Sequence, residues 1–161
     1  MPIDKTRLQQ ALLEKLQNEL DLITRAALMA REEATHDESK ATSKYETHGQ
    51  EAAYLAEGQA RFASELQDSI ALYKTLSFPD FTDGSTVGIG ALVTLESRGR
   101  STLYLLGPRN GGLDIALDGQ TITLITPQSP LGAQLVNARV GTTVHLPGRT
   151  TPQPHRVAAI A

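Results

Sequence analysis

Two adjacent acidic residues, Asp37 and Glu38, lie in a polar stretch between two long apolar repeats and are the side chains best suited to chemistry. Magnesium is a hard cation that takes one or two protein carboxylates and keeps water molecules, so two exposed carboxylates could complete its coordination shell. Adjacent surface acids are also common as a plain solvated face, and that interpretation stays open. His36 and His48 flank the stretch, but their spacing indicates solvent-exposed side chains rather than a metal cluster.

Other catalytic and cofactor-binding patterns are weaker. The chain has no cysteine, which excludes a disulfide framework and any thiolate ligand or nucleophile. Its four histidines are scattered and form no Ser/His/Asp order with supporting turn residues. The glycine-rich stretch 107–112 lacks a following helix and a lysine at the spacing of a phosphate-binding loop, which indicates an ordinary loop. We therefore expect no catalysis by the chain alone and no stably bound cofactor.

The elements that must position the two acids are long helices. Within residues 8–73 apolar residues recur at alternating steps of three and four, which is typical of helices packed along a seam. The polar stretch 35–43 divides this repeat and is long enough to reverse the chain. We predict an antiparallel coiled-coil hairpin with arms of about 30 residues, each about 45 Å long. The predicted seam residues are Leu13, Leu16, Leu20, Ile23, Ala27, Ala30 and Ala34, then Tyr45, Gly49, Ala52, Ala56, Gln59, Phe62, Leu66, Ile70 and Tyr73.

The ends of the two arms also have sequence signals. The first helix is predicted to begin near Ile3 or Asp4, the latter with a negative charge that suits a first turn, and to end near Ala34. The second is predicted to begin at Ser43, because Ser43 and Glu46 have the spacing of a capping box. Asp37 and Glu38 would then lie exposed in the turn at the tip.

Composition changes sharply near residue 78. Residues 79–161 carry eleven of the thirteen glycines and seven of the eight prolines. Residues 1–78 hold nine basic and thirteen acidic residues, a net charge of −4, whereas residues 79–161 hold six and five, a net charge of +1. We predict two domains, 1–78 and 79–161, and neither is basic enough to hold a nucleic-acid backbone by itself.

The second domain is rich in short strand-like runs. We expect strands over 87–96, 101–106, 113–117, 121–125, 140–146 and 155–160, with a hairpin turn at Asp118–Gly119. Ser129 and Pro130 offer the N-cap and first position of a short helix through Leu131, Leu135 and Val136. The predicted class is therefore α+β, with a small antiparallel sheet and one helix after the hairpin.

This order of parts resembles the Gre family of bacterial transcript-cleavage and elongation factors. Residues 87–95 are similar to the family's "VGFGATVTL" strand, residues 122–132 to its "ISISSPIARALIGK" strand-to-helix element, and residues 140–144 to its "VGDVVEV" strand. The resemblance covers nearly the whole chain.

The resemblance implies a partner and a mechanism. It implies that residues 79–161 form an FKBP-like domain that binds RNA polymerase, and that the coiled coil enters the polymerase secondary channel. Contact with nascent RNA or DNA would occur only within that complex. The tip acids would help to hold a catalytic Mg²⁺ of the polymerase and to orient water, so that the polymerase cleaves backtracked RNA. On this reading Asp37 and Glu38 assist the polymerase, and magnesium is shared with it.

The tip departs from the family pattern, which reads approximately "GDLxENAEY". With the tyrosine aligned on Tyr45, Glu38 falls on the first acid and Ala41 on the second. An alternative is therefore a Gre-like competitor or inhibitor that occupies the channel without supporting cleavage.

Two further alternatives come from other classes. An FKBP-type peptidyl-prolyl isomerase is one, although residues 79–161 hold only Phe81 and Tyr104 as aromatic residues to line a prolyl pocket. The other is an interaction module that pairs with a second coiled coil and forms dimers, whereas the hairpin predicts a monomer. The sequence shows no basic segment followed by an apolar run at its start and no stretch near 18 apolar residues, so we expect a cytoplasmic protein without a membrane span.

Overall fold

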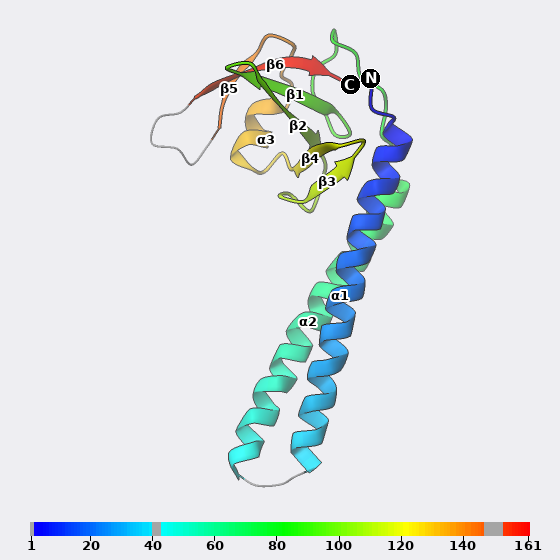
Figure 1. Ribbon diagram of the computed structural model, residues 1–161, viewed down its shortest axis with the longest axis vertical. Helices are drawn as coiled ribbons and strands as arrows, with labels where there is room; N and C mark the ends of the chain where they lie inside the picture. The colour runs from blue at the N-terminus through cyan, green and yellow to red at the C-terminus, as the bar shows by residue number, and fades with distance from the viewer. Residues whose placement is uncertain (1, 40–42, 147–152) are drawn as a thin grey trace. The chain divides into compact units, whose positions relative to one another are not determined.

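The computed structural model is an α+β protein with a long helical region followed by a six-stranded sheet (Figure 1). It describes residues 2–39, 43–146 and 153–161, and within the helical residues 34–39 and 43–56 it describes the backbone but not the side chains. The elements are α1 (Lys5–Ser39), α2 (Ser43–Thr75), β1 (Leu92–Ser97), β2 (Arg100–Leu106), β3 (Asp114–Leu117), β4 (Gln120–Ile125), α3 (Pro130–Leu135), β5 (Thr143–His145) and β6 (Pro154–Ile160).

The chain divides into two compact units. The helical unit is Leu13–Thr75, and the sheet unit combines Met1–Leu12 with Leu76–Ala161. The first turns of α1 therefore belong to the sheet unit, and the rest of that helix belongs to the helical unit. The two predicted domains, 1–78 and 79–161, stay a prediction.

Helix α1 begins where the sequence indicated and ends later. Asp4 is its N-cap, because its carboxylate accepts a hydrogen bond from the Thr6 amide at 2.9 Å and its carbonyl accepts one from Leu8 at 2.9 Å. The predicted end near Ala34 was wrong, since α1 continues to Ser39. Residues 35–39 contain neither glycine nor proline, so their polar character alone does not stop the helix.

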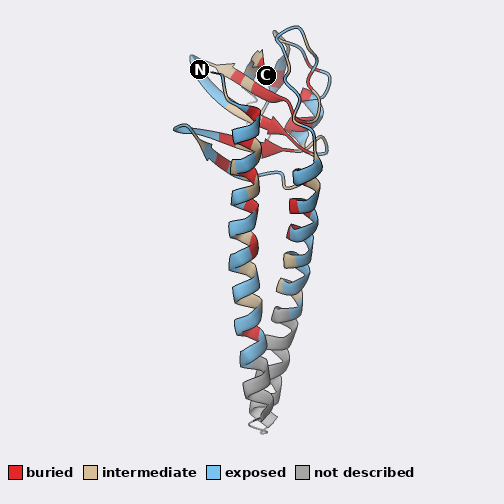
Figure 2. Ribbon diagram, turned by 90° about the vertical axis from the view of Figure 1, so that its right-hand side faces the viewer, coloured by how far each residue is buried: buried red, intermediate tan, exposed pale blue. Residues whose placement is uncertain are grey.

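Within the helical unit, α1 and α2 run side by side (Figures 1 and 2). They are antiparallel, because the last turn of α1 and the first turn of α2 lie at the same end of the pair (Figure 1), and residues 24–31 of α1 share one hollow with residues 60–67 of α2. The buried residues confirm most of the seam that the structure describes, namely Leu16, Leu20, Ala30, Leu66, Ile70 and Tyr73.

The prediction that Phe62 belongs to the seam was wrong. Its side chain is 61% exposed, whereas the neighbouring Ala63 is half-buried. The seam therefore passes from Gln59 to Ala63 and then to Leu66, which keeps the alternating steps of four and three. A small residue at this position allows the two helix axes to lie close together.

The sheet has the strand order β3-β4-β2-β1-β6-β5 and is mixed, so the prediction of an antiparallel sheet was wrong. Strands β2 and β4 are parallel, with Leu103 opposite Ile122 and Leu106 opposite Ile125. The cause is the β2–β3 loop, which carries the chain past one strand position. The hairpin between β3 and β4 then returns β4 into the gap, antiparallel to β3 and hence parallel to β2. The FKBP-like comparison stays a prediction.

The predicted strand over 87–96 is only partly formed. Strand β1 begins at Leu92, and the chain before it turns at Gly90. Gly90 has a φ of +90°, which glycine adopts without the steric strain that a side chain would cause. Val87 instead forms backbone hydrogen bonds of 2.9 Å with Asn137 and Ala138, at the end of α3. This pairing ties the start of the domain to its helix.

The predicted strand over 140–146 is also shorter than expected. Strand β5 covers Thr143–His145, because Gly141 has a φ of +96° and the chain turns there. The predicted turn at Asp118–Gly119 and the predicted cap of α3 are confirmed. Both turn residues have positive φ, and the Gly132 amide donates to the Ser129 hydroxyl at 3.0 Å.

A hydrophobic core lies between α3 and one face of the sheet. Its residues are Val87, Ala91, Val93, Leu95, Leu106, Ile125, Leu131, Leu135, Ala138, Val144, Val157 and Ile160.

The opposite face of the sheet is buried within the same unit. Leu92, Leu105 and Leu124 are at most 4% exposed, and Leu8 and Leu12 of α1 are fully buried. Arg7 joins α1 to the β3–β4 turn through an ion pair with Asp118 at 2.7 Å. The sheet thus has two buried faces, which explains why its central strands are so apolar.

Candidate functional site

The predicted tip acids lie at the end of α1. Asp37 and Glu38 occupy its last turn, so their predicted place in the turn between the helices was wrong. Their side chains lie outside the described residues, as do those of His36 and His48. At about 1.5 Å per residue, Asp37 lies about 36 Å along α1 from Leu13, the first residue of the helical unit. The backbone therefore carries two acidic positions to the end of a long helix, immediately before the chain reverses.

Small residues lie between the helices in the described part of the helical unit. A shallow hollow of about 250 Å³ lies between the helices, with Ala27 on α1 and Ala60 and Ala63 on α2. Leu22, Leu28 and Met29 are more than half exposed along α1. An exposed apolar side chain is ordinary when isolated, and several along one arm give it an apolar surface outside the seam.

Metal binding at the tip is not tested by the side chains that the structure describes. Among those side chains, no group of three or more His, Asp or Glu residues lies close enough together to hold a metal ion. The magnesium site predicted at Asp37 and Glu38 stays a prediction.

None of the helices in the described residues has the length and apolar character that crossing a membrane requires.

The turn in the strand-to-helix element at 122–132 is held by hydrogen bonds between its own residues. The Ser129 hydroxyl donates to the Thr126 carbonyl at 2.7 Å and accepts from the Gly132 amide at 3.0 Å. Gly132 is buried, and a Cβ atom there would lie 1.8 Å from the Thr126 carbonyl oxygen. This element therefore requires glycine at position 132 and a hydroxyl at position 129.

Lys5 is a buried charged residue with specific partners that sequence reasoning missed. Its side chain is 7% exposed, and its amine donates hydrogen bonds to the carbonyls of Gly90 and of Pro79, the latter at 3.1 Å. The amine also lies 5.3 Å from the centroid of the Phe81 ring. Burial lowers the pKa of Lys5 to about 8, and the nearby Asp80 carboxylate acts in the opposite direction. Lys5 thus fastens the segment before β1 to the start of α1.

A sequence signal for Lys5 did exist. A lysine at the first residue of a helix faces the positive end of the helix dipole, where acidic residues are favoured. Its position between Ile3 and Leu8, both apolar, also places it near the buried side of the first turn. A charge in an unfavourable position often has a specific partner.

Comparisons with known proteins gave structural matches only. No protein-family model matches the chain, and no curated protein sequence matches it. Among solved structures, it is similar to GreA factor homolog 1 (Gfh1) of Thermus thermophilus, with 22% identity, a TM-score of 0.38 and coverage of 92% of this chain and 94% of that one. A structure of the transcription factor Gfh1 gives a TM-score of 0.40 with 22% identity over 92% of both chains.

Gfh1 of Thermus aquaticus gives a TM-score of 0.39 with 22% identity over 94% of both chains. TM-scores of 0.38 to 0.40 are too low to support an argument about this chain. Its fold and function are therefore argued from its own residues.

Proposed function

We propose that this protein regulates transcription elongation by binding RNA polymerase through its sheet unit and placing the end of its helical unit near the polymerase active site. The observation that supports this most is the order of parts. Two antiparallel helices come first, and an acidic pair lies in the last turn of the first helix. A sheet unit follows, and its segments 87–95, 122–132 and 140–144 resemble the Gre family.

The helical unit has the form that such a role needs. At about 1.5 Å per residue, the part of α1 in the helical unit, residues 13–39, is about 40 Å long and α2 is about 50 Å long, so the pair forms a slender probe. The seam changes from Leu16 and Leu20 to Ala27 and Ala30 along α1, which lets the helices approach closely toward the tip. A narrow pair of helices suits entry into a channel that admits nucleotides.

The proposed chemistry belongs to the polymerase. Asp37 and Glu38 would supply carboxylate oxygens to a Mg²⁺ ion that the polymerase also holds, and that ion would activate water for cleavage of backtracked RNA. Adjacent positions on an α-helix are about 100° apart around its axis, so we expect the two acids to contribute unequally.

Transcript cleavage on stalled elongation complexes tests this proposal. Wild type should shorten the RNA, and one of Asp37→Ala and Glu38→Ala should lose most of that activity while both still bind polymerase. Glu33→Ala, one turn before Asp37 on α1, is the matched control for removing an acid from the same helix. Equal cleavage by wild type and both tip variants would exclude the carboxylate role.

A second result would distinguish the inhibitory alternative. If wild type binds polymerase and slows elongation without cleaving RNA, the chain is a competitor for the channel, and the departure at Ala41 explains the missing activity. Failure of the wild-type protein to bind polymerase would exclude both the cleavage role and the inhibitory role.

A further inference from the structure

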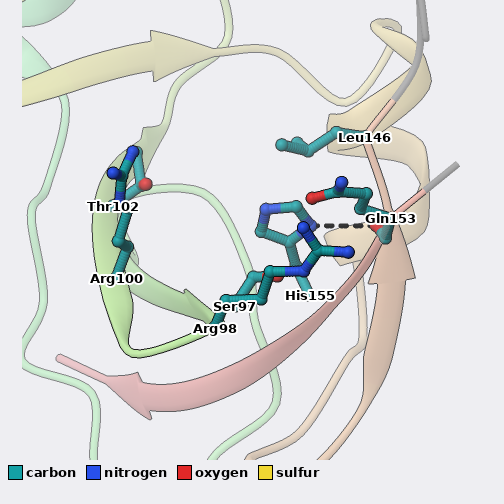
Figure 3. Close-up of a pocket in the computed structure, with 7 residues that line it drawn as sticks. All are labelled: Ser97, Arg98, Arg100, Thr102, Leu146, Gln153 and His155. Carbon is teal, nitrogen blue, oxygen red and sulfur yellow. Dashed lines mark hydrogen bonds between the residues drawn. The ribbon is translucent and has the colours of Figure 1, made fainter.

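A polar pocket of about 540 Å³ lies at one end of the sheet, where the β1–β2 hairpin meets the first residues of β6 (Figure 3). This basic pocket is separate from the tip and from the segment that Lys5 binds. The residues that line it are Ser97, Arg98, Arg100, Thr102, Leu146, Gln153 and His155.

The strand register shows how the basic pocket arises. On β1, Ser97 follows the core residue Leu95 by two positions and so lies on the same face of the sheet. Its partner across the ladder is Arg100, and the partner of Leu95 is Thr102. The face that packs against α3 farther along the strands thus becomes polar at this end.

Strand β6 repeats this change. His155 lies two positions before the core residue Val157 on β6, and it pairs with the core residue Val144 of β5. Leu146 lies one residue after β5 and two positions after Val144, and it keeps an apolar side chain beside the pocket. Strands β1, β2 and β6 therefore carry hydrogen-bonding side chains in place of apolar core side chains at the same end of the sheet.

The charge of the basic pocket is of one sign. Among the described residues that line it are two arginines and a histidine but no acidic residue. Neither Arg98 nor Arg100 forms an ion pair with any residue that the structure describes. The acid on the same strand, Glu96, lies on the opposite face and pairs with Arg156 at 3.6 Å. The pocket therefore has a local positive potential in a chain whose net charge is −3.

The polar side chains of the basic pocket lie on two sides of it, and some of them are held in place by the backbone. Figure 3 shows Arg98 extended toward His155 and Gln153, with Arg100 and Thr102 on the other side. Arg98 and Gly99 both have positive φ, as a tight two-residue hairpin turn requires, and this turn fixes where Arg98 leaves the backbone. The Nδ1 atom of His155 lies 3.0 Å from the Gln153 carbonyl, which can only accept, so this nitrogen carries a hydrogen.

We propose that the basic pocket binds a small anion that carries a diphosphate group, either as free pyrophosphate or as part of a nucleotide. Guanidinium groups match phosphate oxygens in charge and geometry, and the Thr102 hydroxyl can donate to the same oxygens, whereas the Ser97 hydroxyl already donates to the Pro154 carbonyl at 3.1 Å. A volume of about 540 Å³ lies in the range of small-molecule sites and exceeds what a single phosphate group needs. Concave shape and size favour a small ligand over a nucleic-acid strand.

Calorimetric titration of the full chain with pyrophosphate at low ionic strength tests the proposal. Arg100→Gln should weaken binding at least about tenfold, as expected for loss of a charge-assisted hydrogen bond. Arg98→Asn should also weaken it, and asparagine tolerates the positive φ at this position. Arg139→Gln removes the same charge from an exposed site of the sheet unit outside the basic pocket, and its effect should stay below about twofold.

Further titrations identify the ligand. Inorganic phosphate should bind more weakly than pyrophosphate, and a nucleoside diphosphate that binds more tightly would show that the base and sugar add contacts. Amide NMR shifts caused by pyrophosphate should be confined to residues 96–102, 145–146 and 153–156 among the described residues, and the spectrum of each variant shows whether it remains folded.

Three outcomes would overturn the proposal. The first is no pyrophosphate binding at millimolar concentration, and the second is equal weakening by Arg139→Gln and Arg100→Gln. The third is tighter binding of citrate, a carboxylate anion, than of pyrophosphate. An RNA oligonucleotide whose binding depends on Arg98 and Arg100, in the absence of pyrophosphate binding, would assign the surface to nucleic acid instead.

Discussion

The buried amine of Lys5 makes the stability of the sheet unit depend on pH in an unusual direction. In the unfolded chain a lysine keeps its proton up to a pKa of about 10.5, whereas burial lowers the pKa of Lys5 in the fold to about 8. Between these values the unfolded chain binds more protons than the folded chain. Raising the pH therefore stabilises the fold, and lowering it below pH 8 brings the full cost of the buried charge.

The size of this effect follows from the two pKa values. Between pH 7 and pH 9.5 the contribution of Lys5 to the free energy of unfolding should rise by about 2 kcal/mol. Its hydrogen bonds are not lost, because a neutral amine still has two hydrogens for the carbonyls of Pro79 and Gly90. The gain thus comes from removing a poorly solvated charge from a largely buried position.

Comparison with Lys5→Met isolates this contribution, since other titrating groups cancel between the two proteins. Urea unfolding can be followed by fluorine NMR of fluorophenylalanine, because the Phe81 signal reports on the sheet unit and does not titrate. The difference in unfolding free energy between wild type and Lys5→Met should shift in favour of wild type by about 2 kcal/mol from pH 7 to pH 9.5.

Lys15→Met is the matched control, because Lys15 is an exposed lysine of the same helix. It should show no comparable shift. A difference between wild type and Lys5→Met that stays constant over this pH range, or that moves in favour of the variant, would refute the reasoning about the buried charge.

Three further predictions concern the sheet unit. Gly132→Ala should destabilise it by more than about 3 kcal/mol, because the new Cβ would lie 1.8 Å from the Thr126 carbonyl oxygen. The control Gly112→Ala should cost only about 1 kcal/mol, since its Cβ meets nothing within 4 Å and only its φ of +94° is unfavourable. Ser129→Ala should cost about 1 kcal/mol through loss of the α3 cap, measured by urea unfolding, and a neutral result would show that the cap is replaced by water. Arg7→Met should cost less than about 1 kcal/mol, because its ion pair is half exposed, and 1 M salt should remove the difference.

Features that depend on neighbouring residues could be predicted from the sequence. The helical periodicity, the Asp118–Gly119 turn and the cap at Ser129 all follow from spacings of a few residues, and the structure confirms them. The end of α1 was missed because polar residues without glycine or proline permit both a turn and a helix. In residues 35–39 local propensity is too weak to decide between them.

Features that depend on distant pairing could not be predicted. The parallel pairing of β2 with β4 arises because the loop after Leu106 skips one strand position, and nothing in the loop sequence separates this from an ordinary hairpin. Likewise, the place of Lys5 depends on carbonyls of Pro79 and Gly90, which are more than 70 residues away along the chain. Local sequence signals therefore predict where helices and strands lie along the chain, but not which of them lie next to one another in the fold.

The two candidate sites differ for the same reason. The acids at Asp37 and Glu38 were found from the sequence because they are adjacent and flanked by a helical repeat, but their chemistry depends on a partner. Arg98 and Arg100 lie in the same pocket as His155 only because β1 pairs with β6, so no pattern among neighbouring residues predicts the basic pocket. Its chemistry, however, is complete within one unit of this chain. Pyrophosphate binding and transcript cleavage therefore depend on different residues, and Asp37→Ala and Glu38→Ala should leave pyrophosphate binding unchanged.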